Sequence, residues 1–375
     1  MIEPTTLLIA SSETDANLYY ATRFIAPDPF IFLQMKGETL VIMSDLELDR
    51  ARSQAHVDRV LSYTEIERRV REQGLGDPRP ADIVHAVLKE AGVSVLRVPG
   101  NFGLTHALRL QQLGYQLLAA PEPFFESRAI KTEEEIRYIE ASQRATEEAV
   151  AAAHETLRRA SARDGVLWLD GEPLTSERIK KLINVALMER DCVAQHTIVA
   201  GGDQACDPHH EGSGPLPANC SIIFDVFPRS SRTRYFADMS RTVVRGKPSP
   251  ELKRLYQTVK DAQEEAISRI RDGGNGAKIH QGICERFDEA GYRTGLVNGR
   301  MQGYFHGTGH GVGLDIHELP RISRTGSRLQ EGQIVTVEPG LYYPGLGAVR
   351  IEDMVLVTRD GCRNLTNFPK TFELD

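Results

Sequence analysis

Short apolar runs alternate with amphipathic stretches in the first part of the chain. Runs rich in β-branched, aromatic and other apolar residues predict four strands, at residues 6–10, 30–33, 39–43 and 93–98. The pattern over residues 82–91 predicts a helix. Strands and helices that alternate within one segment are typical of an α/β domain, which we therefore expect at the N-terminus.

The pattern changes near residue 127. Thr132 and Glu135 form a capping box at the start of a long helical stretch: the hydroxyl and the carboxylate each accept a hydrogen bond from a backbone N–H that the helix leaves free. A single core stops growing at about 250–300 residues, so a chain of 375 residues has room for two. We expect an N-terminal domain over residues 1–126 and a C-terminal domain over residues 127–375.

The C-terminal domain has a different pattern. Two further helices are predicted, over residues 176–190 and 251–270. Three short segments punctuated by Gly and Pro have the composition of strands, at residues 221–227, 334–337 and 349–357. We expect an α+β domain with helices packed on one face of a largely antiparallel sheet.

Composition narrows the class of protein. The formal net charge of −7 argues against nucleic-acid binding, because phosphate binding needs a basic face. The start of the chain lacks the basic and apolar segments of a signal peptide, and no apolar run approaches the roughly 20 residues that span a bilayer. The five cysteines are scattered without a CxxC pair, as is typical of reduced thiols. We expect a cytoplasmic protein with neither nucleic-acid nor membrane partners.

Three carboxylates of the C-terminal domain follow mainly apolar runs. These residues are Asp225, Glu338 and Glu352. An ionised carboxylate is costly to bury unless it is paired or bound to a cation. Three of them on neighbouring core strands would repel one another, and a divalent metal ion is the usual solution. The pattern therefore indicates a metal site.

Asp238 and a glycine-rich run, HGTGHGVGLDIHELP, add further donors. The run contains His306, His310 and His317. Taken singly, each such residue is more often a salt-bridged or hydrogen-bonded group than a ligand. In combination they favour a metal site, and carboxylates with one imidazole suit manganese, cobalt, iron or zinc.

The spacing of the carboxylates also predicts two hairpins. Asp225 and Asp238 fit the two arms of the first, and Glu338 and Glu352 flank the second, whose turn contains Pro and Gly. Hairpins of this kind would bring residues that are distant in the sequence to one place.

A family resemblance follows from these motifs. The segments IVAGGDQACDPHH, IIFDVF, YFADMSRTVV, HGTGHGVGLDIHELP, TVEPGLY and GAVRIEDMVLV occur in this order over residues 198–357. The C-terminal domain resembles the pita-bread metallopeptidases, which include prolidase, aminopeptidase P and methionine aminopeptidase. The stretch AIKTEEEIRYIEAS and the separate N-terminal domain, which would be creatinase/prolidase-like, resemble the prolidase and aminopeptidase P branch.

The resemblance implies a site for two divalent metal ions, with Asp238 and Glu352 as the bridges between them. The implied ligands are Asp225, Asp238, His310, Glu338 and Glu352. The implied ions are Mn²⁺ or Co²⁺, with Zn²⁺ or Fe²⁺ as alternatives. The implied catalytic residues are His209, His317 and Glu338, and the implied substrate-binding residues are His209, His306, His317 and Arg350.

The implied activity is hydrolysis of the peptide bond that precedes proline in short peptides, by a homodimeric Xaa-Pro dipeptidase or Xaa-Pro aminopeptidase. A hydroxide activated by the two ions would be the attacking group. Two alternatives stay open: a pita-bread aminopeptidase or amidohydrolase without proline preference, and a non-catalytic pita-bread binding protein. The complete ligand set favours an enzyme.

The chain departs from the family pattern near the first hairpin. Phe227 stands where the family often has Gly, and the turn before Asp238 is longer than usual. Ser240 stands where many members have Thr, but it keeps a hydroxyl that could bond a ligand carboxylate. We expect these departures to affect the hairpin tip and the rim of the substrate pocket.

Overall fold

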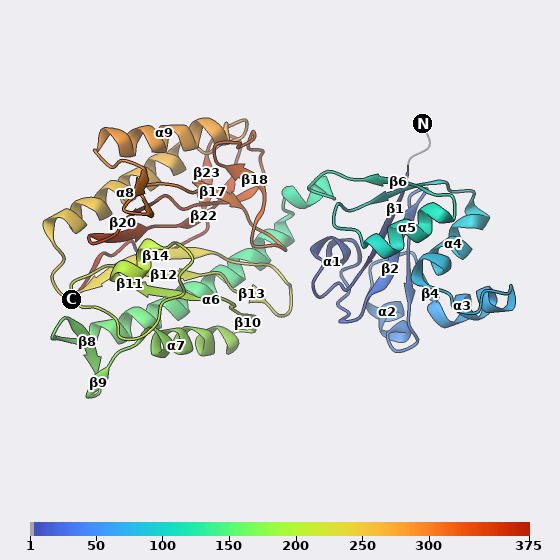
Figure 1. The fold of residues 1–375 in the computed structure, drawn as a ribbon, viewed down its shortest axis with the longest axis horizontal. Coiled ribbons are helices and arrows are strands. Elements are labelled where there is room, and N and C mark those ends of the chain that lie inside the picture. Colours follow the sequence, from blue (N-terminus) through green and yellow to red (C-terminus); the bar gives the residue numbers. More distant parts are fainter. Residues whose placement is uncertain (1–3) are drawn as a thin grey trace. The chain divides into compact units, whose positions relative to one another are not determined.

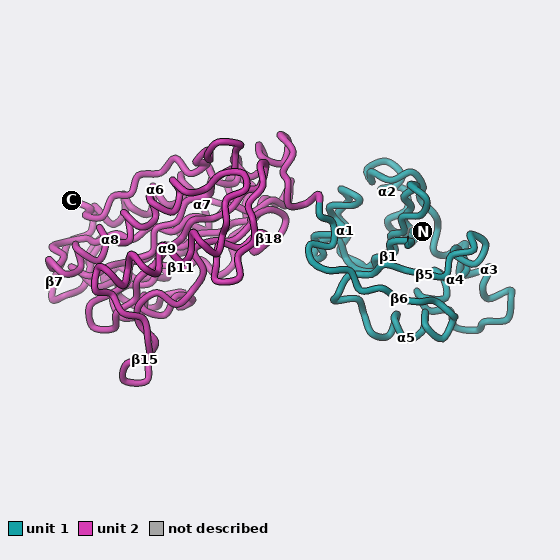
Figure 2. The backbone as a smooth tube through the Cα atoms, turned by 90° about the horizontal axis from the view of Figure 1, so that it is seen from above, with its two compact units in different colours: residues 1–126 teal, residues 127–375 magenta. Residues whose placement is uncertain are grey.

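The computed structural model describes residues 4–375. The chain forms two compact units, residues 1–126 and 127–375 (Figure 2). A short 3₁₀ turn, η1 (Glu126–Ala129), lies at the boundary. Each unit has hydrophobic cores of its own.

The first unit contains a six-stranded mixed sheet in the order β4-β3-β2-β1-β5-β6. Its strands are β1 (Thr5–Ala10), β2 (Phe30–Met35), β3 (Glu38–Met43), β4 (Arg59–Ser62), β5 (Val95–Val98) and β6 (Gln116–Ala119). Its helices are α1 (Ala16–Thr22), α2 (Leu48–Gln54), α3 (Tyr63–Glu72), α4 (Pro80–Ala91) and α5 (Leu104–Gln112). The four expected strands and the expected helix are all present, with ends that differ by up to two residues.

The sheet of the first unit is buried on both faces. Successive side chains of a strand point to opposite faces, so Leu7 packs with Ile31 in one core whereas Leu8 packs with Phe32 in another. Burial on both faces explains why β1 reads as a continuous apolar run.

The second unit begins with its longest helix. Its helices are α6 (Glu133–Arg158), α7 (Ser176–Met188), α8 (Pro250–Ser268) and α9 (Gly276–Glu289), with a 3₁₀ turn η2 (Gly202–Cys206). The expected capping box is present, because Thr132 Oγ1 accepts from the Glu135 N–H and Glu135 Oε2 accepts from the Thr132 N–H. Figure 1 shows α6 and α7 along one side of this unit and α8 and α9 along the other.

The two largest sheets of the second unit have four and five strands. The first, in the order β11-β12-β14-β24, consists of β11 (Ile198–Gly201), β12 (Ile222–Val226), β14 (Met239–Arg245) and β24 (Glu373–Leu374). The second, in the order β18-β17-β19-β22-β23, consists of β17 (Gly309–Gly311), β18 (Glu318–Ile322), β19 (Ile334–Val337), β22 (Asp353–Val357) and β23 (Cys362–Asn364). The hairpin of β20 (Gly340–Tyr343) and β21 (Gly347–Arg350) is a separate pair.

The remaining strands of the second unit belong to sheets of two or three strands. They are β7 (Ser161–Arg163), β8 (Val166–Leu169), β9 (Glu172–Pro173), β10 (Cys192–Val193), β13 (Arg229–Ser230), β15 (Gly295–Val297) and β16 (Arg300–Gln302). Within residues 4–375, no helix combines the length and the apolar character needed to cross a membrane.

The arrangement differs from the single sheet with helices on one face that the sequence suggested. Apolar residues of α6 and α7 form one core with the first sheet, and those of α8 and α9 form another with the second sheet. The expected strand over residues 349–357 is two strands, because β21 pairs with β20 whereas β22 pairs with β19. Ile351 and Glu352 lie in the gap between them.

Candidate metal centre

The two hairpins predicted from the sequence are present. In the first, β12 pairs antiparallel with β14, so that Asp225 lies opposite Ser240, and Asp238 directly precedes β14. In the second, β20 pairs antiparallel with β21. Glu338 follows directly after β19, before this hairpin, and Glu352 comes after it, in the gap before β22.

The predicted ligands converge on His310, which lies in β17. Its Nε2 atom is 3.7 Å from Asp238 Oδ2 and 3.5 Å from Glu338 Oε1. One ligand atom each of Asp238, His310 and Glu352 lies within 4.8 Å of the others, a spacing that suits a shared metal ion. Asp225 joins the same group through an ion pair with Arg350, whose Nη2 atom is 2.7 Å from Asp225 Oδ2.

Three of the carboxylates, those of Asp238, Glu338 and Glu352, lie close together in a largely buried site that disfavours their ionised forms. Burial, and then repulsion by the other carboxylates, raises the pKa of Asp238 and that of Glu352 well above the ordinary values. Burial raises the pKa of Glu338 to about 8, although the charge of Arg350 opposes this. Asp225 Oδ1 is buried and accepts no hydrogen bond from residues 4–375. A divalent cation would relieve the repulsion and give this oxygen a partner, so the residues fit a metal site.

His310 has the protonation state that a metal ligand needs. Its Nδ1 lies 3.1 Å from the Gly311 carbonyl, which can only accept a hydrogen bond, so Nδ1 carries the proton. Burial lowers the pKa of His310 to about 3, so the ring is neutral and the Nε2 lone pair faces the carboxylates. Close packing around this strand requires Gly309, because a Cβ there would lie 1.9 Å from the Thr336 carbonyl oxygen.

Arg350 links the carboxylates to one another. Its side chain is 4% exposed, and it donates to Asp225 through Nη2 and to Ser240 Oγ through Nε at 3.0 Å. Ser240 Oγ in turn donates to Glu352 Oε2 at 2.8 Å, as its hydroxyl led us to expect. The sequence resemblance implied that Arg350 binds substrate, and the contacts made within the protein show that it also orients two carboxylates.

Tyr342 is a member of this network that the sequence did not single out. Its hydroxyl accepts from Arg350 Nη1 at 3.0 Å and lies 2.9 Å from His306 Nε2. Burial raises the pKa of Tyr342 to about 12, so it keeps its proton. His306 Nδ1 is 2.8 Å from the Gly307 carbonyl and carries the ring proton, so Tyr342 donates to Nε2. Tyr342 ends the segment TVEPGLY, within the predicted second hairpin, but no role was predicted for it from the sequence.

The other two histidines of the predicted site, His209 and His317, lie at the edge of the cluster. The ring of His317, in the bend before β18, is 4.5 Å from that of His310 between centroids, at an angle of 86°. Burial lowers the pKa of His317, and the nearby charge of Arg321 lowers it further. His209 is exposed in the turn after η2. The structure therefore brings the predicted residues together, with His209 and His317 on the more exposed side.

A buried ion cluster fixes the residue that follows His317. Glu318 pairs with Lys131 at 2.8 Å and also with Arg128. The same carboxylate accepts hydrogen bonds from the backbone N–H groups of Leu314 and Asp315. No role was predicted for these residues from the sequence, because their contacts join segments that are far apart in the chain.

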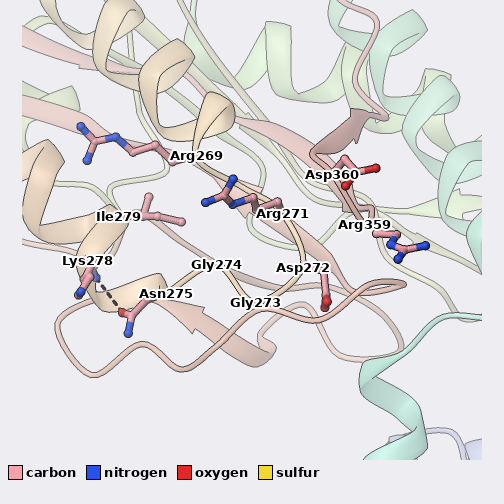
Figure 3. A pocket seen from close by; sticks show the side chains of 10 residues that line it. All are labelled: Arg269, Arg271, Asp272, Gly273, Gly274, Asn275, Lys278, Ile279, Arg359 and Asp360. Atoms are coloured by element: carbon pink, nitrogen blue, oxygen red, sulfur yellow. Dashed lines mark hydrogen bonds between the residues drawn. The ribbon is translucent and has the colours of Figure 1, made fainter.

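A surface cavity of about 550 Å³ lies elsewhere on the second unit (Figure 3). Its lining residues are Arg269, Arg271, Asp272, Gly273, Gly274, Asn275, Lys278, Ile279, Arg359 and Asp360. None of them belongs to the carboxylate cluster. The predicted site residues therefore lie outside this cavity.

Known proteins resemble the chain in sequence and in fold. The Xaa-Pro dipeptidase of Pyrococcus furiosus is 33% identical to this chain over 241 residues, and that of Pyrococcus horikoshii is 31% identical to it over 242 residues. Each match covers 64% of this chain. The matched region spans 63% of the length of each relative.

The solved structures match over nearly the whole chain. An X-Pro aminopeptidase from Thermotoga maritima has a TM-score of 0.81 at 23% identity, over 99% of this chain and 97% of that one. A prolidase from Pyrococcus furiosus has a TM-score of 0.79 at 24% identity, over 97% of this chain and 96% of that one. These similarities confirm the expected fold class, an α/β N-terminal part followed by an α+β pita-bread part.

A family model adds to these similarities. The model that describes metallopeptidase family M24 matches residues 137–359, which contain all five carboxylate and imidazole residues of the cluster. The match covers more than half of the chain. The chain therefore belongs to metallopeptidase family M24.

Proposed function

We propose that the protein is a dinuclear metallopeptidase that hydrolyses the peptide bond preceding proline. The observation that carries the proposal is the largely buried cluster of four carboxylates around the neutral imidazole of His310, in which Asp238, His310 and Glu352 present atoms within 4.8 Å of one another. Such a cluster is unfavourable unless a cation binds there.

The ligand set proposed for two divalent ions consists of Asp225, Asp238, His310, Glu338 and Glu352, with Asp238 and Glu352 as the bridges. Oxygen donors with one imidazole suit Mn²⁺ or Co²⁺, with Zn²⁺ or Fe²⁺ as alternatives. When bound, divalent ions lower the pKa of water from about 15.7 towards about 7 and polarise carbonyl oxygens.

Glu338 and His317 are the proposed proton-transfer and oxyanion-stabilising residues. The Glu338 carboxylate is 20% exposed and lies 3.5 Å from His310 Nε2. Its partial exposure beside the proposed metal site suits it to accept a proton from water and to deliver it to the leaving nitrogen. His317 lies beside His310 on the more exposed side, where its ring can donate to a developing oxyanion. His209 and His306 are proposed to position the substrate.

The preference for proline is supported by the names of the relatives, which are Xaa-Pro dipeptidases. A proline ring has an apolar surface and a fixed φ, so a preformed pocket recognises it at little entropic cost. We expect kcat/KM for Xaa-Pro bonds to exceed that for Xaa-Ala bonds by at least about tenfold, or about 1.4 kcal/mol of transition-state binding.

The test uses metal-free protein reconstituted with Mn²⁺, Co²⁺ or Zn²⁺ and assayed on matched Xaa-Pro, Xaa-Pro-Yaa and Xaa-Ala peptides. Cleavage of Xaa-Pro alone would identify a dipeptidase, and cleavage of Xaa-Pro-Yaa an aminopeptidase. Equal rates on the Pro and Ala peptides would instead support a pita-bread aminopeptidase without proline preference. Cleavage of none of the peptides with any of the ions would contradict the proposed activity.

The resemblance also supports a cytoplasmic homodimer that acts on short peptides. Light scattering on the purified protein tests the oligomeric state, since a homodimer has twice the mass of the 41.7 kDa chain. Subcellular fractionation tests the location.

A further inference from the structure

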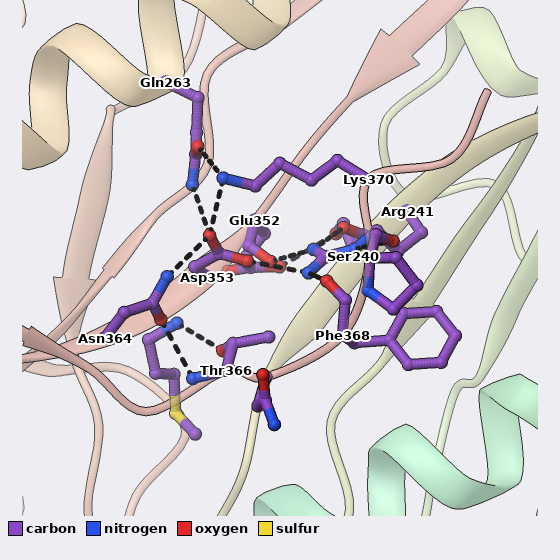
Figure 4. Close-up of polar contacts among 12 residues, drawn as sticks. Ser240, Arg241, Gln263, Glu352, Asp353, Asn364, Thr366, Phe368 and Lys370 are labelled. Carbon is purple, nitrogen blue, oxygen red and sulfur yellow. Dashed lines mark hydrogen bonds and ion pairs between the residues drawn. The ribbon is translucent and has the colours of Figure 1, made fainter.

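Arg241 lies on β14, next to Ser240, and is enclosed by the protein. Its side chain is 1% exposed. A guanidinium has five N–H donors, and each of them has an acceptor here (Figure 4). The acceptors are Ser240 O (2.9 Å) and Glu352 O (2.6 Å) for Nη1, Asp353 Oδ1 (2.8 Å) and Phe368 O (2.7 Å) for Nη2, and Pro369 O (3.3 Å) for Nε.

Glu352, one of the proposed ligands, lies outside the strands, so its backbone position depends on these contacts. Strand β21 ends at Arg350 and β22 begins at Asp353, and the two strands pair with different partners. The Glu352 N–H donates to Ser240 O at 3.0 Å, and its carbonyl accepts from Arg241. The Glu352 peptide groups are thus held by two consecutive residues of β14, while Ser240 Oγ holds the carboxylate.

A second set of contacts fixes the orientation of the Arg241 guanidinium. Asp353, which pairs with Arg241, is 1% exposed. Its other oxygen, Oδ2, accepts from Gln263 Nε2 (3.1 Å), Asn364 Nδ2 (3.1 Å) and Lys370 Nζ (2.9 Å). These partners come from α8, from β23 and from the segment near the C-terminus, as Figure 4 shows. The guanidinium therefore has one arrangement that satisfies all its donors.

We propose that Arg241 is a positioning residue that sets the metal affinity of the site by holding the Glu352 backbone. This inference rests on the proposed function, because it takes Glu352 as a ligand. Arg241 does not touch the reacting atoms, and it acts through the carbonyl of Glu352. The carbonyls of Phe368 and Pro369 make the C-terminal segment part of the same support.

The test compares Arg241→Lys with the wild type in the full chain. Lysine keeps the positive charge and can pair with Asp353, but with three donors it cannot reproduce the five hydrogen bonds of Arg241. Loss of such outer contacts typically lowers metal affinity by about 10–100-fold. We expect a weakening of Mn²⁺ binding in that range by calorimetry, and an altered visible absorption spectrum of the Co²⁺ form, which reports ligand geometry.

Arg245→Lys is the matched control. Arg245 lies on the same strand and also donates to backbone carbonyls, those of Ala160 and of Leu374 near the C-terminus, but it contacts none of the proposed ligands. We expect Arg245→Lys to lower the thermal stability of the metal-free protein and to leave the Mn²⁺ affinity and the Co²⁺ spectrum unchanged.

The outcomes separate the two proposals. Wild-type Mn²⁺ affinity in Arg241→Lys, or an equal loss in both variants, would overturn the role of Arg241. Absence of Mn²⁺ and Co²⁺ binding by the wild type would instead overturn the proposed function. If Arg241→Lys does not fold, Asp353→Asn replaces it. This variant keeps the acceptor and weakens the ion pair, and an unchanged Mn²⁺ affinity in it would contradict the inference.

Discussion

At the scale of single residues, the charge state of Glu338 predicts how the stability of the metal-free protein depends on pH. Its pKa is raised from 4.5 to about 8 in the folded state. The unfolded state therefore releases this proton at a lower pH than the folded state, and the contribution of Glu338 to stability falls as the pH rises from about 5 to about 8. Histidines with a lowered pKa, such as His306 and His310, act in the opposite direction at the acidic end of this range, so thermal unfolding of metal-free wild type is compared with that of Glu338→Gln. The stability of the wild type relative to Glu338→Gln should fall across the range, and a difference that stays constant or rises would contradict this assignment.

His317 separates the chemical step from metal binding, because its ring lies beside His310 without being among the proposed ligands. His317→Ala should keep its metal content and lose about 10²–10⁴-fold in kcat, the usual effect of a positioned acid, base or oxyanion donor. Elemental analysis and steady-state kinetics measure the two quantities. His196→Ala, at an exposed ion pair with Glu211, is the control. Loss of the metal from His317→Ala would make His317 a ligand instead.

Asp238 and Glu352 are the proposed bridges between the two ions, so each is expected to be essential for metal binding. Asp238→Ala and Glu352→Ala should each bind fewer than two ions per chain and lose activity. Elemental analysis and peptide hydrolysis check both results. Full occupancy with undiminished turnover in either variant would exclude it as a bridge.

At the scale of secondary-structure elements, β17 depends on close backbone packing that only glycine allows. A Cβ on Gly309 would lie 1.9 Å from Thr336 O, whereas a Cβ on Gly295 would meet no atom within 4 Å. Gly309→Ala should therefore destabilise the protein by about 1–3 kcal/mol through overpacking and displace His310. Gly295→Ala, in the β15–β16 hairpin, should be close to neutral. Denaturant unfolding and Mn²⁺ titration of both variants test the difference, which equal stabilities would contradict.

At the scale of the whole molecule, metal binding should stabilise the second unit in particular. A ligand present at 100 times its Kd stabilises the folded state by about 2.7 kcal/mol, and the proposed ligands all belong to residues 127–375. Because each unit has its own cores, scanning calorimetry of the full chain should show a transition that moves to higher temperature with Mn²⁺ and returns after chelation. The Asp238→Ala variant should not show this shift. A thermogram unchanged by Mn²⁺ would contradict the metal site.

Local patterns in the sequence were enough to predict most of the helices and strands around the proposed metal site. The helix over residues 176–190 is α7, which ends two residues earlier, and the strand before Glu338 is β19, with the expected bounds. The carboxylates after apolar runs also stood out, because an ionised carboxylate is costly to bury unless it is paired or bound to a cation. Each of these signals depends only on residues that are close together in the sequence, so a local pattern is enough to predict it.

Tertiary structure decided which groups these residues meet. The break at Ile351 and Glu352 arises because β21 and β22 pair with different strands, and the composition of residues 349–357 is equally compatible with one strand. The hydrogen bond from Arg241 to Glu352 spans 111 residues, and Tyr342 links Arg350 to His306 only because β20 folds back on β21. The sequence by itself determined which side chains could form a metal centre. Only the folded chain decided how they are held, because contacts between distant segments leave no periodic trace in the sequence.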